Sequence, residues 1–175
     1  QNGSWLSVRN LSDDYTGFVD AKQLRPLEES EVLRLQSLPL FVNRGLFSDQ
    51  AGWKGGRLQL PAGCSFYGMQ NMLFNFGQRQ YSFDGMIVPY SFADTDSLLM
   101  TAMNYLNCPY LWGGKTYMGL DCSGLTQVVF KQHGISLLRD AAQQATQGEL
   151  INFLSDSLPG DLAFFDNSEG RIIHV

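Results

Sequence analysis

The sequence has no basic run and no long apolar run. It contains 12 Lys and Arg against 17 Asp and Glu, which gives a formal net charge of −5. The cations are scattered, so we expect no nucleic-acid partner and no electrostatic attraction to anionic lipid. No apolar stretch approaches the roughly 18 residues that indicate a spanning helix. We therefore expect no membrane span.

Cysteine and histidine are also scarce. The three cysteines are Cys64, Cys108 and Cys122, and an odd number leaves at least one free thiol unless pairing is intermolecular. Cys64 and Cys108 are the pair to test in an oxidising compartment, although two small buried side chains are the simpler interpretation. The only histidines are His133 and His174, and none of these residues has metal-ligand spacing. We expect neither a metal nor another cofactor.

The composition, 44% hydrophobic and 17% charged, is typical of a packed globular protein. Residues 1–92 contain short β-rich runs separated by turn residues, a pattern that favours small all-β barrels. A short helix is expected between Glu28 and Leu38, with Ser30 as a candidate cap. The expected strands lie at Trp5–Val8, Gly17–Val19, Arg57–Leu60, Cys64–Tyr67, Met72–Phe76 and Gly85–Val88.

The hydrophobic period changes near Asp94, after which helices precede antiparallel strands. This order predicts an α+β domain. The first helix begins at Asp94 or Thr95 and buries Leu98, Leu99, Ala102, Met103 and Leu106. A second runs from Cys122 to His133, with Leu125, Val128 and Val129 inward and Gly134 after its end, and a third runs from Ala141 to Gln147 behind Asp140. A turn at Pro159–Asp161, a buried strand at Leu162–Phe165, a hairpin turn at Asn167–Gly170 and a strand at Arg171–Val175 follow.

Cys122 stands after the glycine-rich loop Tyr110-Leu-Trp-Gly-Gly114 and at the start of a helical pattern. Unpaired N–H groups and the helix dipole favour thiolate, the nucleophilic form, at such a position. The same N–H groups can stabilise an oxyanion. An inert buried cysteine is the alternative, but it would need neither the glycine pair nor a downstream histidine. Asp121 is a good N-cap.

His174 lies on the expected last strand, 52 residues after Cys122, and its side chain points away from those of Ile173 and Val175. A helix-start nucleophile and a strand imidazole can meet in a folded domain, although a core or surface histidine without function would fit the same pattern. His133 is at the far end of a helix roughly 18 Å long and cannot reach the thiol. It is better interpreted as a helix C-terminal residue.

Four motifs resemble the NlpC/P60 cysteine peptidases: Tyr110-x-Trp-Gly-Gly, Asp121-Cys-Ser-Gly-Leu, Leu158-Pro-Gly-Asp-Leu-Ala-Phe-Phe and Ile173-His-Val. The resemblance implies a papain-like fold over residues 93–175 that hydrolyses cell-wall peptides. It implies Cys122 as nucleophile and His174 as general base. The family's third polar residue would lie beyond Val175, so we expect the chain to be a fragment of a longer protein.

The segment Asp13-Asp-Tyr-x-Gly-Phe-Val19 resembles the end of a bacterial SH3 (SH3b) domain. This divides the chain into the end of a first SH3b-like domain (1–26), a linker helix with a second SH3b-like barrel (27–92) and the catalytic domain (93–175). The combination resembles γ-D-glutamyl-L-diamino acid endopeptidases, which act on stem peptides with a free N-terminal L-alanine. It implies that Asp121 faces the substrate ammonium. The other residues that it implies for the pocket are Ser123, Tyr110, Trp112 and Tyr15.

Simpler roles stay open for the pocket residues. Asp121 can be only a cap, Ser123 a local hydrogen bonder, and Tyr110 and Trp112 core aromatics. The resemblance implies a peptidoglycan stem peptide or muropeptide fragment as partner, and we expect a monomer. The alternatives are a non-catalytic wall-binding SH3b protein and a Cys-His acyltransferase. We expect the bacterial cell envelope, periplasmic or secreted, as location, with the cytoplasm as the alternative.

Overall fold

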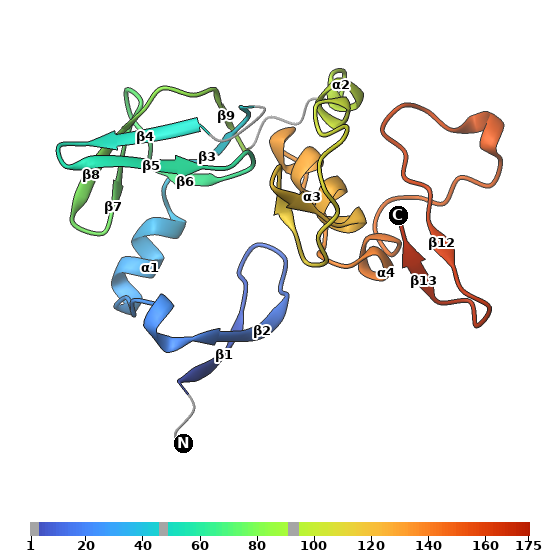
Figure 1. Ribbon diagram of the computed structural model, residues 1–175, viewed down its shortest axis with the longest axis horizontal. Helices are drawn as coiled ribbons and strands as arrows, with labels where there is room; N and C mark the ends of the chain where they lie inside the picture. The colour runs from blue at the N-terminus through green and yellow to red at the C-terminus, as the bar shows by residue number, and fades with distance from the viewer. Residues whose placement is uncertain (1–3, 46–48, 91–94) are drawn as a thin grey trace.

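The computed structural model describes residues 4–45, 49–90 and 95–175. The chain forms an N-terminal hairpin, a β-rich unit and a C-terminal mixed α/β part (Figure 1). The hairpin and β unit join through a helix, and the C-terminal part lies beside both. Within the described residues, no helix is long and apolar enough to cross a membrane.

The hairpin pairs β1 (Trp5–Arg9) with β2 (Thr16–Asp20) in antiparallel register. A 3-10 turn, η1 (Ala21–Gln23), and α1 (Glu29–Gln36) follow. Both strands and the helix are confirmed. The expected cap at Ser30 is wrong, because α1 begins one residue before it and its N-cap position, Glu28, makes no side-chain capping bond. No residue of α1 is buried.

The β unit consists of two antiparallel sheets. The three-stranded sheet has the order β6-β3-β9 and the four-stranded sheet the order β5-β4-β8-β7. Both sheets supply one aromatic core, in which Phe66 lies 4.9 Å from Phe74 and 4.9 Å from Phe83 between ring centroids. The strands are β3 (Leu40–Asn43), β4 (Asp49–Trp53), β5 (Gly56–Leu60), β6 (Ser65–Tyr67), β7 (Leu73–Phe76), β8 (Arg79–Phe83) and β9 (Ile87–Pro89).

The expected SH3-like barrel agrees with this unit only in its β content. The described strands form two separate sheets, and no closed barrel is evident among them. β3, β4 and β8 were not anticipated. Their sequences contain polar or glycine residues such as Asn43, Gly52 and Ser82, which weaken the apolar signature of a strand.

The C-terminal part is built around α3 (Cys122–Gln132), which packs against α2 (Leu98–Met103). Its core contains Leu98, Tyr105, Leu120, Val128 and Val129, together with Ala62 of the β unit. The expected inward faces of Val128 and Val129 are confirmed. The remaining elements are β10 (Lys115–Thr116), β11 (Gly119–Leu120), α4 (Ala141–Gln144), η2 (Leu154–Asp156), β12 (Phe165–Asp166) and β13 (Ile172–His174).

The expected apolar face of α2 is partly wrong. Leu98 is buried, but Leu99, Met103 and Leu106 are more than half exposed. The helix ends at Met103 and continues as tight turns, with the amide of Tyr105 bonded to the carbonyl of Ala102. The buried face runs instead through Leu98, Thr101 and Tyr105, at i, i+3 and i+7, whereas Leu99, Met103 and Leu106 lie on another side. The expected cap at Asp94 lies outside the described residues, and the alternative at Thr95 is wrong, because α2 begins at Leu98 with Ser97 at its N-cap position.

The expected buried strand at Leu162–Phe165 is also wrong. β12 begins only at Phe165, which is 58% exposed, and among the described elements only β13 pairs with it. Leu162 and Phe164 are half-buried. The turn at Gly160, the hairpin turn at Asn167–Gly170 and the following strand are confirmed. The third helix is shorter than expected and ends at Gln144.

Buried polar contacts join the β unit to the end of α3. His133, the C-cap of α3, is 1% exposed, with Nδ1 3.1 Å from Arg44 and Nε2 2.7 Å from the Thr101 hydroxyl. Next to it, the Gln132 amide donates to the carbonyl of Gly45 at 3.0 Å. The expectation that His133 ends the helix is therefore confirmed.

Candidate active site

Cys122 is the first residue of α3, and Asp121 is its N-cap. The Asp121 side chain accepts a hydrogen bond from the Gly124 amide at 2.6 Å, as expected for a capping residue. The Cys122 side chain is half-buried. The thiol is thus placed at the N-terminal turn, where backbone N–H groups are unpaired and the dipole favours negative charge.

The Asp121 carboxylate has four donors around it. Besides Gly124, Gly113 donates its amide at 2.8 Å, and Arg139 donates from two guanidinium nitrogens at 3.1 and 2.6 Å. Each oxygen therefore accepts two hydrogen bonds, and the side chain is buried. A substrate ammonium would have to displace one of these donors. The geometry fits the capping role and links the glycine loop to the start of α3.

This network fixes the charge of Asp121. Burial alone would raise the pKa of its carboxyl group, but hydrogen bonds from Arg139, Gly124 and Gly113 outweigh burial and hold the pKa below its usual range. Burial would likewise lower the pKa of Arg139, yet the bonds to Asp121 raise it. Both groups are ionised at neutral pH, as a bidentate pair with side chains about 10% exposed.

Arg139 also fixes the position of Ser123. The sequence analysis did not identify Arg139 as a site residue. Its guanidinium donates to the Ser123 hydroxyl at 3.0 Å, and Ser123 is 5% exposed. From the other side, the Gln144 amide of α4 donates to the Ser123 carbonyl at 2.9 Å. The available signal was an arginine directly before the expected cap Asp140. A charged residue at that place is ordinarily a solvated one, so the signal is weak.

The glycine loop packs directly on the first turn of α3. The Gly114 amide donates to the carbonyl of Leu111 at 2.8 Å, and the Asp121 amide donates to the carbonyl of Gly114 at 3.2 Å. A Cβ on Gly124 would collide with the Gly114 carbonyl, and a Cβ on Gly114 would collide with the carbonyl of Gly119. The two glycines are therefore required by close backbone approach.

The loop aromatics are exposed rather than part of the core. Tyr110 is 65% exposed and Trp112 is 87% exposed. Both stand within a few residues of Gly113, whose amide is bonded to Asp121. Their exposure on the loop that is bonded to Asp121 leaves them available to contact a ligand, and the pocket role that the resemblance implies stays a prediction.

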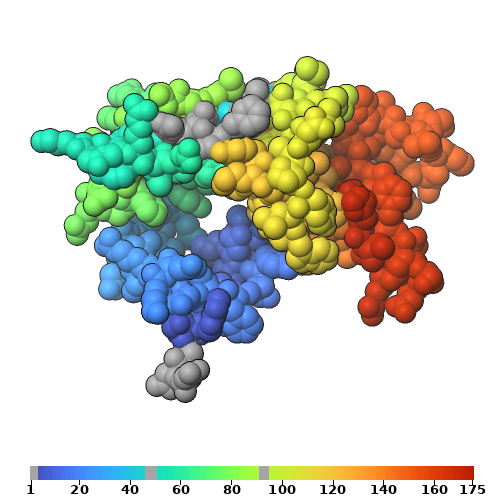
Figure 2. Space-filling model, in the orientation of Figure 1, coloured from blue at the N-terminus to red at the C-terminus, as the bar shows by residue number. Residues whose placement is uncertain are grey.

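Tyr15 comes to the same region from the β1–β2 turn. It is 42% exposed, and its near neighbour Asp13 accepts a hydrogen bond from Gln127 of α3, the helix that begins at Cys122. The N-terminal hairpin, drawn in blue, meets the yellow surface of the C-terminal part in Figure 2. The structure thus brings the turn that carries Tyr15 against α3, although Asp13 and Gln127 are separated by more than a hundred residues.

His174 lies on β13, which packs against α4 (Figure 1). α4 in turn holds the first two turns of α3, because Gln144 bonds the Ser123 carbonyl and accepts from the Thr126 hydroxyl at 2.7 Å. The imidazole is exposed and its centroid is 5.9 Å from the ring of Phe165. The strand of His174 and the start of the Cys122 helix therefore contact the same short helix, while the base role stays a prediction.

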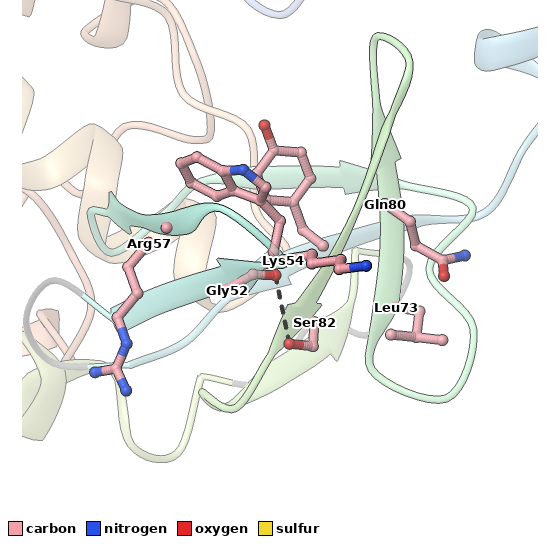
Figure 3. Close-up of a pocket in the computed structure, with 9 residues that line it drawn as sticks. Gly52, Lys54, Arg57, Leu73, Gln80 and Ser82 are labelled. Carbon is pink, nitrogen blue, oxygen red and sulfur yellow. Dashed lines mark hydrogen bonds between the residues drawn. The ribbon is translucent and has the colours of Figure 1, made fainter.

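A shallow cavity of about 400 Å³ lies elsewhere, on the four-stranded sheet (Figure 3). Trp53, Tyr81, Lys54 and Arg57 are among its lining residues, and Arg79 lies 5.4 Å from the Trp53 ring. No thiol, imidazole or carboxylate lines it. It is therefore separate from the thiol and the imidazole that the sequence singles out.

The other two cysteines are unpaired. Cys64 packs against the core of the β unit and Cys108 against the core of the C-terminal part. Both are half-buried, which agrees with small apolar side chains in two different cores. Within the described residues, no group of three or more His, Cys, Asp or Glu is arranged to hold a metal ion.

Comparisons with known proteins agree on the C-terminal part. The NlpC/P60 family profile matches residues 107–175. A γ-D-glutamyl-L-lysine dipeptidyl-peptidase of Bacillus subtilis (strain 168) is 38% identical over 192 aligned residues, which cover all of this chain and 63% of the relative. A probable endopeptidase p60 of Listeria grayi is 40% identical over 85 residues, which cover 49% of this chain and 16% of the relative. The chain thus spans less than two thirds of either relative.

Among solved structures, an NlpC/P60 family protein from Bacillus cereus ATCC 10987 superposes with a TM-score of 0.78 at 23% identity. The match covers 99% of this chain and 64% of that one. At this identity the likeness shows the fold, a mixed α/β arrangement of the same kind.

Proposed function

We propose, from the premise that residues 107–175 form an NlpC/P60 family domain, that this chain is part of a peptidoglycan-acting cysteine peptidase. The bond that we propose it to hydrolyse joins γ-D-glutamate to the diamino acid of stem peptides with a free N-terminal L-alanine. The observation that carries the proposal is the position of Cys122 at the start of α3, inside the matched segment and beside the buried Asp121–Arg139 pair.

In the proposed reaction, the Cys122 thiolate attacks the γ-glutamyl carbonyl carbon. The negative charge that develops on oxygen is stabilised by the backbone N–H of Cys122. The C–N bond then breaks, and His174 as imidazolium gives its proton to the leaving amine. Water attacks the resulting thioester while His174 accepts a proton. The products are the glutamyl carboxylic acid and the regenerated thiol.

The proposed substrate contacts differ in their support. Tyr110 and Trp112 are exposed beside the loop, and Tyr15 approaches from the hairpin, so these three side chains are the ones that we propose to contact the peptide. Asp121 and Ser123 are buried and bonded to Arg139. For these two we propose that they shape the site by ordering the loop and the helix start.

The test uses the full-length protein and two purified stem peptides, one with lysine and one with diaminopimelate. Cys122→Ala should abolish release of L-Ala-γ-D-Glu, measured by mass spectrometry, because the nucleophile is lost. Cys108→Ala, the same change at a half-buried thiol of the neighbouring core, should keep it. Full activity of the Cys122→Ala variant would disprove the assignment. Transfer to an added amine instead of water would indicate an acyltransferase.

A second candidate is a non-catalytic wall-binding module. The cavity on the four-stranded sheet, lined by Trp53, Tyr81 and two cations, favours it. Alkylation separates the candidates, because a Cys122 thiol that reacts with iodoacetamide below pH 7 indicates an enzyme and an inert thiol indicates a binder.

We further propose that residues 1–26 end a first SH3b-like domain, that residues 27–92 are a linker helix and a second one, and that residues 93–175 are catalytic. The antiparallel sheets around one aromatic core support this division for the second unit. We also propose a monomer in the cell envelope, where the peptidoglycan substrate is found.

A further inference from the structure

Asp13 is a buried carboxylate in an otherwise exposed turn. It lies between β1 and β2 and is 7% exposed, whereas Leu11 is 68% exposed and Tyr15 is 42% exposed. A charged side chain is rarely buried without partners, because removing it from water is costly. Its contacts therefore show why the turn is folded against the rest of the chain.

The partner of Asp13 is a side chain of the nucleophile helix. Gln127 of α3, which is 4% exposed, donates from its amide nitrogen to one Asp13 oxygen at 3.0 Å. The same nitrogen donates to the Leu137 carbonyl at 2.9 Å. Two acceptors fix the orientation of the amide, and its oxygen is left buried without a hydrogen-bond partner among the described residues. The amide nitrogen of Gln127 thus makes both hydrogen bonds, while the buried amide oxygen makes none, which costs free energy.

The second oxygen of Asp13 holds Tyr15. It accepts a hydrogen bond from the Tyr15 backbone amide at 3.2 Å. One carboxylate therefore bonds the nucleophile helix through one oxygen and the backbone of Tyr15 through the other. Gln127 follows Cys122 by five residues on α3, so this joint holds Tyr15 beside the first turns of the nucleophile helix. In the first of those turns, Ser123 is bonded to Arg139.

The negative charge of Asp13 also acts on two lysines. Lys115 of β10, just after the glycine loop, and Lys131 near the end of α3 are both half-buried. Burial lowers the pKa of each ammonium group, and the negative charge of Asp13 opposes that change in both. Asp13 thus provides negative charge at the place where the hairpin meets α3 and β10.

We propose that Asp13 is a positioning residue, which fastens the N-terminal hairpin to α3 and thereby sets the Tyr15 phenol at the rim of the active site. The inference rests on the proposed function, since it assigns Tyr15 to substrate binding. Asp13 itself touches neither the nucleophile nor the peptide. Loss of the tether should therefore weaken substrate binding and leave the chemistry of Cys122 unchanged.

Asp13→Asn tests this with a matched neighbour. An asparagine at position 13 that keeps its bond to the Tyr15 amide must turn its own NH₂ toward the Gln127 NH₂, so the bond to α3 is lost. Asp14→Asn is the control, because Asp14 is exposed one residue further on and pairs only loosely with Arg9, at 3.6 Å. Asparagine also tolerates the φ of 55° at that position.

The expected result is a KM for the stem peptide raised about tenfold in Asp13→Asn, the scale of one lost hydrogen-bonded contact. The kcat value should stay within about twofold, as expected when only ground-state binding is lost. Asp14→Asn should match wild type. In a Tyr15→Phe background, Asp13→Asn should raise KM by less than about twofold, because both changes remove the same contact.

Two readouts need no peptidase activity. Amide hydrogen exchange across residues 5–20 should be faster in Asp13→Asn than in Asp14→Asn, and iodoacetamide should modify Cys122 at the wild-type rate in both. If Asp13→Asn unfolds, the same measurements are made on Gln127→Leu, which removes the same hydrogen bond from the α3 side.

Equal exchange and equal KM in the two asparagine variants would overturn the proposal. Faster exchange with an unchanged KM would also overturn it, because the tether would then not position Tyr15. If wild-type protein cleaves no stem peptide, the proposed function fails, and the exchange comparison still decides whether Asp13 fastens the hairpin.

Discussion

Replacing Arg139 by methionine isolates the buried pair that orders the site. The change removes two bonds to Asp121 and one to Ser123 while keeping a side chain of similar length. Breaking a buried ion pair from one side typically costs about 3–5 kcal/mol, because the other charge is left uncompensated. Asp121 keeps the amides of Gly113 and Gly124, so we expect the lower end, about 3 kcal/mol.

Arg9→Met is the matched control for this change. Arg9 and Asp14 are 3.6 Å apart, with side chains 66% and 76% exposed. An exposed pair contributes about 0–1 kcal/mol, since water screens it. Urea unfolding followed by circular dichroism at pH 6 should therefore separate the two variants by roughly 2–3 kcal/mol, with equal denaturant slopes.

The pH dependence of the free energy of unfolding tests whether the loss in Arg139→Met comes from the charge of Asp121. The pKa of Asp121 is lowered from its ordinary value of 3.8, so in wild type its contribution to stability is present above pH 3.8 and lost as the pH falls through the lower, folded value. Without Arg139, its hydrogen bonds and its positive charge no longer lower the pKa of Asp121, so this pKa is higher than in wild type. The difference in the free energy of unfolding between wild type and Arg139→Met should thus be at its full value at pH 6 and smaller at pH 3.5. A difference in unfolding free energy below about 1 kcal/mol at pH 6, or a difference that grows as the pH falls, would refute the reasoning.

Two further predictions concern the glycine contact and a second thiol. Gly124→Ala should destabilise the protein by about 1–3 kcal/mol in urea unfolding, because the new Cβ meets the Gly114 carbonyl, although alanine normally favours a helix. Gly17→Ala, which meets nothing within 4 Å, is the control, and equal stability of the two variants would contradict the steric argument. Burial raises the pKa of the Cys64 thiol, more than Lys131 lowers it, so iodoacetamide at pH 7.5 should modify Cys64 more slowly in native protein than in urea. Site-resolved mass spectrometry measures both rates, and equal rates would show that burial does not suppress the thiolate.

Sequence reasoning succeeded where one local pattern determines one element. The helix after Asp121 has a capping residue, inward Val128 and Val129 at helical spacing, and Gly134 with φ of 74° after its end. All these signals lie within fourteen residues and point to the same structure. The hairpin turn at Asn167–Gly170 succeeded for the same reason.

It failed where distant contacts decide. Arg139 and Gln144 look like ordinary polar residues in the sequence, and only the folded chain brings them to Asp121 and to the Ser123 carbonyl. Leu162–Phe165 reads as a buried strand because all four residues are apolar, yet burial depends on partners that a local window does not contain. The catalytic assignments of Cys122 and His174 stay predictions.

The solvated helix α1 has a consequence for how this architecture can diversify. None of its residues is fully buried, and only Glu31, Val32 and Leu35 are half-buried, so it connects the hairpin to the β unit with few packing contacts of its own. The hairpin is instead fastened at its turn, where Asp13 is hydrogen-bonded to Gln127 of α3. A recombination event at α1 would therefore exchange the hairpin with Tyr15 as one segment, and the new hairpin would have to supply an acceptor for the Gln127 amide.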